Sequence, residues 1–124
     1  RIMGGAFYNC KNLKKIEIPE SVTSVAMAAF AGSGIKKLIL PHNLVKIQNG
    51  DYGYKVFEKK HGLFPTKNLR VIEIHSKKLK KIEKNSFGGL TRKVVIKVPK
   101  SKKKKYTKML RKSGLSKKIK IKSL

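Results

Sequence analysis

Hydrophobic and polar residues alternate in four short stretches along the chain. Each stretch has the form apolar-x-apolar, and the apolar pairs are Ile16/Ile18, Leu38/Leu40, Ile72/Ile74 and Ile96/Val98. Alternation with a period of two residues is typical of a β-strand that buries one face. A proline, which cannot donate a backbone hydrogen bond to a sheet, directly follows every pair except the third, where His75 stands instead. We therefore expect four short strands, each ended by a turn.

Two further apolar features recur in step with these strands. A phenylalanine precedes each strand at a similar distance, at Phe7, Phe30, Phe64 and Phe87. A second apolar segment follows each of the first three strands, at Val22-x-x-Val25, Leu44-x-x-Ile47 and Leu79-x-x-Ile82. One such unit cannot bury its own apolar face, whereas stacked copies share a continuous core. The sequence therefore predicts about four stacked units over residues 1–99, with equivalent residues in internal columns.

The polar residues of the predicted strands define a candidate binding face. Because side chains alternate across a strand, residues next to the buried ones point outward. The outward positions of a parallel sheet then include Lys15, Glu17, Lys37, Ile39 and Glu73. We predict that this face contacts a protein partner.

The step along the sequence from the second strand to the third is about a dozen residues longer than the other two steps. This difference predicts an insertion near residues 49–62. Its glycine, asparagine and aspartate residues suit a turn-rich loop. Its rings, Tyr52, Tyr54 and Phe57, are suited to an interface because they are large and amphipathic. The same rings would equally serve to pack the insertion onto the repeats, and the sequence leaves both interpretations open.

The first unit reads Ala-Phe-x-x-Cys-x-x-Leu-x-x-Ile-x-Ile-Pro-x-x-Val, with Ala6, Phe7, Cys10, Leu13, Ile16, Ile18, Pro19 and Val22 at the named positions. This pattern resembles the BspA-type leucine-rich repeats of bacterial surface proteins, closely over residues 2–47 and more loosely over 48–99. The departures are the insertion, His75 in place of proline, and Lys93 in place of leucine. The resemblance implies a right-handed solenoid with a parallel sheet on one face. It also implies secretion or display at the cell surface, adhesion to a host or bacterial surface protein, and no catalytic activity.

Residues 100–124 depart from the repeat, and they predict a small strand-helix-strand unit that caps the last repeat. A helix is expected to begin at an N-cap Ser101 and to end at Ser113-Gly114. Residues 118–122 alternate lysine with isoleucine, as in an edge strand that discourages pairing with another chain. The expected apolar face of the helix consists of Tyr106, Met109 and Leu110.

Charge adds a second candidate site. The chain has 32 Lys and Arg against 6 Asp and Glu, a net charge of +26, and no acidic residue follows Glu83. Such an excess attracts polyanions. Lysines in the first turn of a helix oppose its dipole by about 0.3–1 kcal/mol each, so helix stability alone does not favour them. The hypothesis that follows is contact with an anionic cell-wall or glycosaminoglycan polymer at Lys102, Lys103, Lys104, Lys105, Lys108 and Lys112. The same lysines would equally serve as a solubilising surface, and the sequence leaves both interpretations open.

A nucleic-acid-binding module is the competing class, because the same charge would attract nucleic acid. The chain shows neither a glycine-rich phosphate-binding motif nor a recognised nucleic-acid-binding motif, which makes this class less favoured. No apolar run approaches the roughly 20 residues that span a bilayer. We therefore expect no membrane insertion, and we expect the chain to be a monomer; the resemblance implies that it is secreted or displayed on the surface.

No cofactor, metal or catalytic site is expected. Cys10 is the single cysteine, so it forms no internal disulfide, and the repeat places it inward. His42 and His75 lack a nearby set of further ligands for a metal. Asp51 and the Glu58/His61 pair bring acids and a histidine together in the insertion, but their spacing matches no catalytic arrangement.

Overall fold

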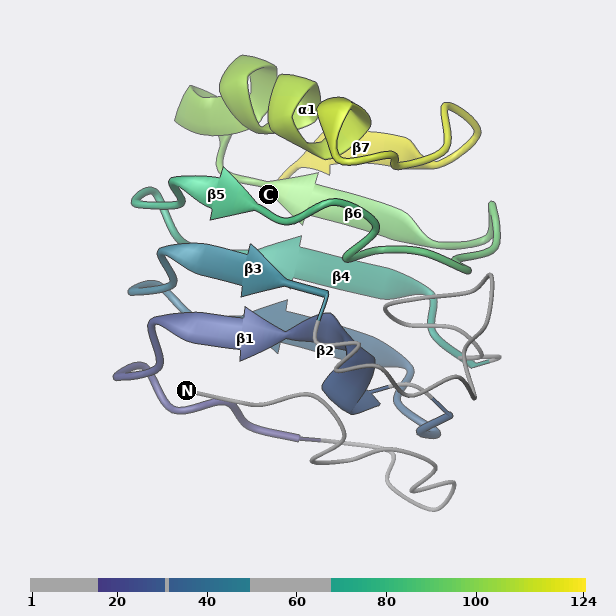
Figure 1. The fold of residues 1–124 in the computed structure, drawn as a ribbon, viewed down its shortest axis with the longest axis horizontal. Helices are drawn as coiled ribbons and strands as arrows, with labels where there is room; N and C mark the ends of the chain where they lie inside the picture. Colours follow the sequence, from purple (N-terminus) through teal and green to yellow (C-terminus); the bar gives the residue numbers. More distant parts are fainter. Residues whose placement is uncertain (1–15, 31, 50–67) are drawn as a thin grey trace.

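A computed structural model describes residues 16–30, 32–49 and 68–124. The strands form two parallel sheets, one in the order β1-β3-β5 and the other in the order β2-β4-β6-β7 (Figure 1). From β1 to β6, successive strands therefore alternate between the sheets, whereas β7 follows β6 in the larger sheet. The elements in chain order are β1 (Ser24–Ala26), η1 (Met27–Phe30), β2 (Lys37–Leu40), β3 (Lys46–Gln48), β4 (Val71–Ile74), β5 (Lys81–Ile82), β6 (Val95–Val98), η3 (Lys100–Lys102), α1 (Lys103–Lys112) and β7 (Lys120–Ser123).

The register of the larger sheet is the predicted one. Leu38 pairs with Ile72, and Ile72 pairs with Ile96, which in turn pairs with Ile121 of β7. Leu38, Ile72 and Ile96 are all buried in the core. Since a slip of one residue would turn these side chains outward, burial of apolar side chains specifies the register. The predicted strands at 38–40, 72–74 and 96–98 and their shared internal column are confirmed.

The second sheet was not predicted. The sequence indicated one sheet and a second apolar segment in each unit, and these segments are β1, β3 and β5. Val25 pairs with Ile47, and Ile47 pairs with Ile82. Val25 and Ile47 are fully buried, and Ile82 packs partly buried against the same core. Strands of two or three residues are too short to show a period of two, which is why the pattern did not reveal them.

The first predicted strand is absent, because residues 16–19 form no strand. The side chain of Ile18 is nevertheless buried in the core, as predicted. Glu20, directly after this segment, bonds to the next repeat: its carbonyl accepts from Asn43 Nδ2 at 2.9 Å and its carboxylate accepts from the His42 N–H at 2.9 Å. This segment therefore packs its apolar side chain into the core without pairing as a β-strand.

The recurrent phenylalanines are buried where the structure describes them. Phe30 lies in η1, Phe87 lies in the turn after β5, and both belong to the core. Phe7 and Phe64 lie outside the described residues, as does most of the predicted insertion. The four-membered phenylalanine column, the right-handed winding and the boundary at residue 99 stay predictions.

The C-terminal segment contains the expected helix and edge strand, but the first strand of the predicted strand-helix-strand unit is absent, because Lys100–Lys102 form the 3₁₀ turn η3. α1 and β7 lie at the end of the stack that is remote from β1 and β2 (Figure 1), and β7 is the edge strand beside β6. Gly114 ends the helix with φ of 104°, a conformation that disfavours a side chain, and the Leu115 N–H donates back to the Leu110 carbonyl at 3.1 Å. The predicted helix end is confirmed.

The predicted N-cap at Ser101 is wrong. A 3₁₀ turn, η3, precedes α1, and its first bond joins the Lys102 N–H to the Pro99 carbonyl at 2.9 Å. Ser101 therefore lies inside this turn, and the N-cap of α1 is Lys102, whose side chain makes no capping bond.

Tyr106 fixes α1 to the repeats. Its side chain is fully buried, and its hydroxyl donates to the Ser76 carbonyl at 2.8 Å and accepts from the Leu79 N–H at 3.1 Å. Burial raises the pKa of this phenol, with the bond from Leu79 acting in the opposite direction. Ser76 Oγ in turn donates to the Leu44 carbonyl at 2.5 Å. One chain of bonds therefore joins the helix to two repeats.

We expect Tyr106→Phe to lower the free energy of unfolding by about 1–3 kcal/mol, because it leaves a buried carbonyl and a buried N–H without their partner. Urea denaturation measures the change. Lys108→Gln on the exposed side of α1 is the control and should change stability by less than about 0.5 kcal/mol. Equal stability of Tyr106→Phe and the control would contradict the role of the hydroxyl.

Candidate functional site

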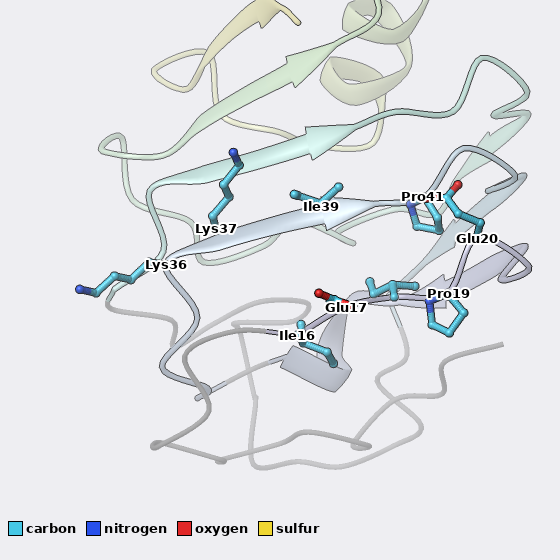
Figure 2. Close-up of a pocket in the computed structure, with 9 residues that line it drawn as sticks. Ile16, Glu17, Pro19, Glu20, Lys36, Lys37, Ile39 and Pro41 are labelled. Carbon is cyan, nitrogen blue, oxygen red and sulfur yellow. The ribbon is translucent and has the colours of Figure 1, made fainter.

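A groove of about 830 Å³ separates residues 16–20 from β2 (Figure 2). Its apolar surface comes from both sides, with Ile16 and Pro19 on the first segment and Ile39 and Pro41 on the second. Acidic and basic side chains line it as well, and they are Glu17, Glu20, Lys36 and Lys37. The groove therefore combines apolar surface with charges of both signs.

The groove lies along an edge of β2 with which no described strand pairs. In a parallel sheet, the backbone groups of alternate residues point to opposite neighbours. The carbonyls of Lys36 and Leu40 accept bonds from the β4 side, at 2.9 Å from the Arg70 N–H and 3.1 Å from the His75 N–H. The backbone groups of Lys37 and Ile39 consequently face the groove. Within residues 16–30, 32–49 and 68–124, no strand pairs with this edge.

The side chains predicted to form an outward face are brought together here. Ile39 is 43% exposed, although it is a large apolar residue. Its register partner on β4 is Glu73, and Lys37 Nζ lies 3.0 Å from Glu73 Oε2. Glu17 is exposed across the groove. The remaining predicted partner-binding residues, Lys15, Tyr52, Tyr54 and Phe57, lie outside the described residues.

Glu73 differs from the prediction of an exposed position. Its side chain is only 11% exposed, because it is held between Lys37 and His75, whose Nε2 lies 2.7 Å from Glu73 Oε1. Burial alone would raise the pKa of this carboxyl, but the bonds from His75 and Lys37 outweigh it and the pKa is lowered. Glu73 is therefore a charged side chain that is already paired with Lys37 and His75, and it is not free to bind a partner.

A row of ionisable groups crosses the turns that follow the strands, and the sequence did not predict it. His42 Nδ1 lies 2.9 Å from Glu20 Oε2, and the rings of His42 and His75 meet edge to face with centroids 5.1 Å apart. The backbone bond from His42 and then its ring bond lower the pKa of Glu20. The sequence contained a pattern that could have predicted this contact. Glu20 follows Pro19 as His42 follows Pro41, so the two residues occupy equivalent positions in consecutive repeats and lie next to each other.

The described residues hold no group of three or more His, Cys, Asp and Glu side chains arranged to bind a metal. The rings of His42 and His75 are in contact, but each ring bonds to a different carboxylate, that of Glu20 or that of Glu73. Cys10 and the acids and histidine considered for catalysis, Asp51, Glu58 and His61, lie outside the described residues.

The lysines predicted to contact polyanions lie on η3 and α1, at the other end of the stack from the groove (Figure 1). Lys102 is partly buried, and the exposed members of the set are Lys103, Lys104, Lys105, Lys108 and Lys112. As predicted, lysines occupy the first turn of α1, which contains no acidic residue.

Comparison with known proteins identifies the family. The sequence model described as "BspA type Leucine rich repeat region (6 copies)" matches residues 1–55 and 59–124. The chain therefore belongs to the BspA-type leucine-rich-repeat family, and its parallel strands in two sheets fit a repeat fold. The chain matches no curated protein and no solved structure. In the described part of the chain, no helix is long and apolar enough to cross a membrane.

We expect Glu73→Gln to lower the free energy of unfolding at pH 7 by about 1 kcal/mol, since it removes the charge that Lys37 and His75 hold. The lowered pKa of Glu73 means that the folded state favours the carboxylate. Its stabilising effect is therefore full above the ordinary value of 4.5 and is lost as the pH falls below it toward the folded-state pKa. Urea denaturation at a series of pH values measures the difference between wild type and variant.

Glu17→Gln is the matched control, because Glu17 is an exposed carboxylate on the same side of the molecule. Its effect on stability should be small at every pH. A difference between wild type and Glu73→Gln that grows as the solution is acidified would contradict the assignment of the pKa direction.

Proposed function

We propose that the chain is a non-enzymatic protein-binding module in which an extended segment of the partner adds as a strand to β2. The observation that supports this most strongly is the open edge of β2 beside an apolar groove. An unpaired strand edge presents backbone donors and acceptors in a row, and partner proteins use such edges by adding a strand. Leucine-rich repeats are in general non-enzymatic binding repeats, which agrees with this assignment.

Side chains would supply the specificity of such a complex. Ile39 projects from the middle of the open edge and would pack against an apolar residue of the added strand. Glu17 offers a negative charge along the same groove, and Lys37, which is also paired with Glu73, offers a positive one. A partner segment that alternates apolar and charged residues would therefore fit better than a uniformly charged one.

The family relation supports display at the cell surface or secretion, with adhesion to another surface protein as the biological role, because BspA-type proteins are typically surface-associated. We place the chain outside the cell on this basis. We also propose that the repeats wind as a right-handed solenoid and that α1 and β7 cap it, since they occupy one end of both sheets.

The basic end would contact an anionic polymer of the cell wall or of the glycosaminoglycan type, because the charge of +26 attracts polyanions. A nucleic acid is less well matched by the described residues. Single strands bind by stacking on exposed aromatic rings, and the described aromatic side chains, Phe30, Phe87 and Tyr106, are buried.

We expect Ile39→Ser to weaken binding of selected peptides by at least about tenfold, because a central apolar anchor contributes more than 1 kcal/mol to an interface. Linear peptides would be selected from a random library against the wild-type chain, and their affinities would be measured by titration. Methylation of alternate backbone nitrogens in a selected peptide should abolish binding, because strand addition needs the peptide N–H groups.

Leu124→Ser is the matched control, since Leu124 is the other large apolar side chain that is exposed among the described residues. It should leave peptide binding unchanged. Peptides that bind Ile39→Ser as tightly as wild type, or that tolerate methylation at every backbone nitrogen, would disprove the proposed site.

A further inference from the structure

A second groove lies between the smaller sheet and the C-terminal helix. It has a volume of about 340 Å³ and is bounded by β5 and the turn after it on one side and by α1 on the other. Its lining includes Lys80, Lys81, Ile82, Lys84, Met109 and Lys112. Four lysines and two apolar residues therefore line the groove. We call this set the lysine groove.

The charges of the lysine groove are not balanced within the described structure. Its lining contains no carboxylate, and the structure shows no ion pair for any of its four lysines among the residues that it describes. The nearby Glu83 accepts a bond from the Asn49 N–H at 3.3 Å. Lys81 also stands opposite Lys46 in the register of β5 and β3. Like charges placed opposite each other weaken a sheet, so sheet stability does not account for this arrangement.

The apolar residues at the floor of the groove restrict the kind of ligand that it can bind. Ile82 and Met109 are partly buried side chains that pack against the core and leave apolar surface between the lysines. A pocket with apolar walls and a few placed charges fits a ligand that has an apolar face and anionic substituents. Sugar rings carry such C–H faces, and uronate or sulfate groups supply the charge. Polyphosphate has no apolar face, and the described part of the chain exposes no aromatic ring for a nucleic-acid base.

We infer that the lysine groove binds an anionic polysaccharide, with Lys80, Lys81, Lys84 and Lys112 on its acidic groups and Ile82 and Met109 against a sugar ring. This inference rests on the proposed contact with anionic polymers, and it assigns that contact to specific residues. It moves the site from the first turn of α1 to the junction of α1 with β5, and of the lysines predicted from sequence only Lys112 lines the groove. Lys105 is two helical turns earlier on the same face of α1, where a longer polymer would continue.

The test compares two variants of equal charge. The groove variant replaces Lys80, Lys81, Lys84 and Lys112 with glutamine. The control variant replaces four lysines of the other sheet and its flanks with glutamine, namely Lys93, Lys97, Lys120 and Lys122. Affinity for heparin, a sulfated polysaccharide, is measured by titration over a salt series. Thermal unfolding of both variants establishes that they fold.

The groove variant should bind heparin at least about tenfold more weakly at physiological salt, and its plot of log affinity against log salt should be shallower by about 3. The control variant should lose less than about threefold. Equal losses in both variants would show diffuse attraction and overturn the site while leaving polymer contact intact. Full affinity in the groove variant would also overturn the site, and absence of binding by the wild type would overturn the polymer contact itself.

A variant of unchanged charge tests the apolar floor. Met109→Ser should weaken heparin binding several-fold, by about 1 kcal/mol or less on the affinity scale, and should leave polyphosphate binding unaltered. Loss of both ligands in equal measure, or of neither, would overturn the assignment of a sugar ring to the floor. Tighter binding of duplex DNA than of heparin, with the same loss in the groove variant, would overturn the assignment to a polysaccharide. None of these outcomes depends on the Ile39 experiment.

Discussion

Registered pairing between equivalent strands of successive repeats is the constraint on which this structure depends. Leu38, Ile72 and Ile96 lie side by side in one sheet, and Val25, Ile47 and Ile82 do so in the other. No single repeat has enough apolar surface to fold alone, so the core exists only where copies stack. The same register decides which side chains face outward. The register that pairs Leu38 with Ile72 inside the core also pairs Ile39 with Glu73 on the outer face.

The two ends of the stack of repeats present different kinds of surface. Among the described residues, no strand pairs with the outer edge of β2, which lies beside a groove of apolar and charged residues. At the other end, β6 is covered by β7, and the helix α1 is bonded to the repeats through Tyr106. The lysine groove lies at this second end, between β5 and α1. Binding of a peptide strand and binding of an anionic polymer would therefore use separate surfaces of one chain. An adhesion module could hold both at once.

The sequence predicts the elements whose apolar residues alternate over several positions. Strands β2, β4 and β6, their register and the buried face of α1 followed from periodicity alone. The second sheet did not, because β5 has only two residues. The predicted N-cap at Ser101 was wrong because a 3₁₀ turn with Pro99 as its N-cap begins at Lys100 and contains Ser101. Glu73 was expected to be exposed, but its burial depends on Lys37 and His75, which come from different turns and strands. The open edge of β2 and the lysine groove depend on contacts between distant segments, which no local pattern encodes.

Cross-strand nuclear Overhauser effects in isotope-labelled protein test the registered pairing most directly. The account predicts contacts between the backbone protons of Leu38, Ile72, Ile96 and Ile121 in one series and of Val25, Ile47 and Ile82 in the other. A series displaced by one residue, in which Leu38 meets Val71 or Glu73 instead of Ile72, would contradict it, as would the absence of contacts within the second series.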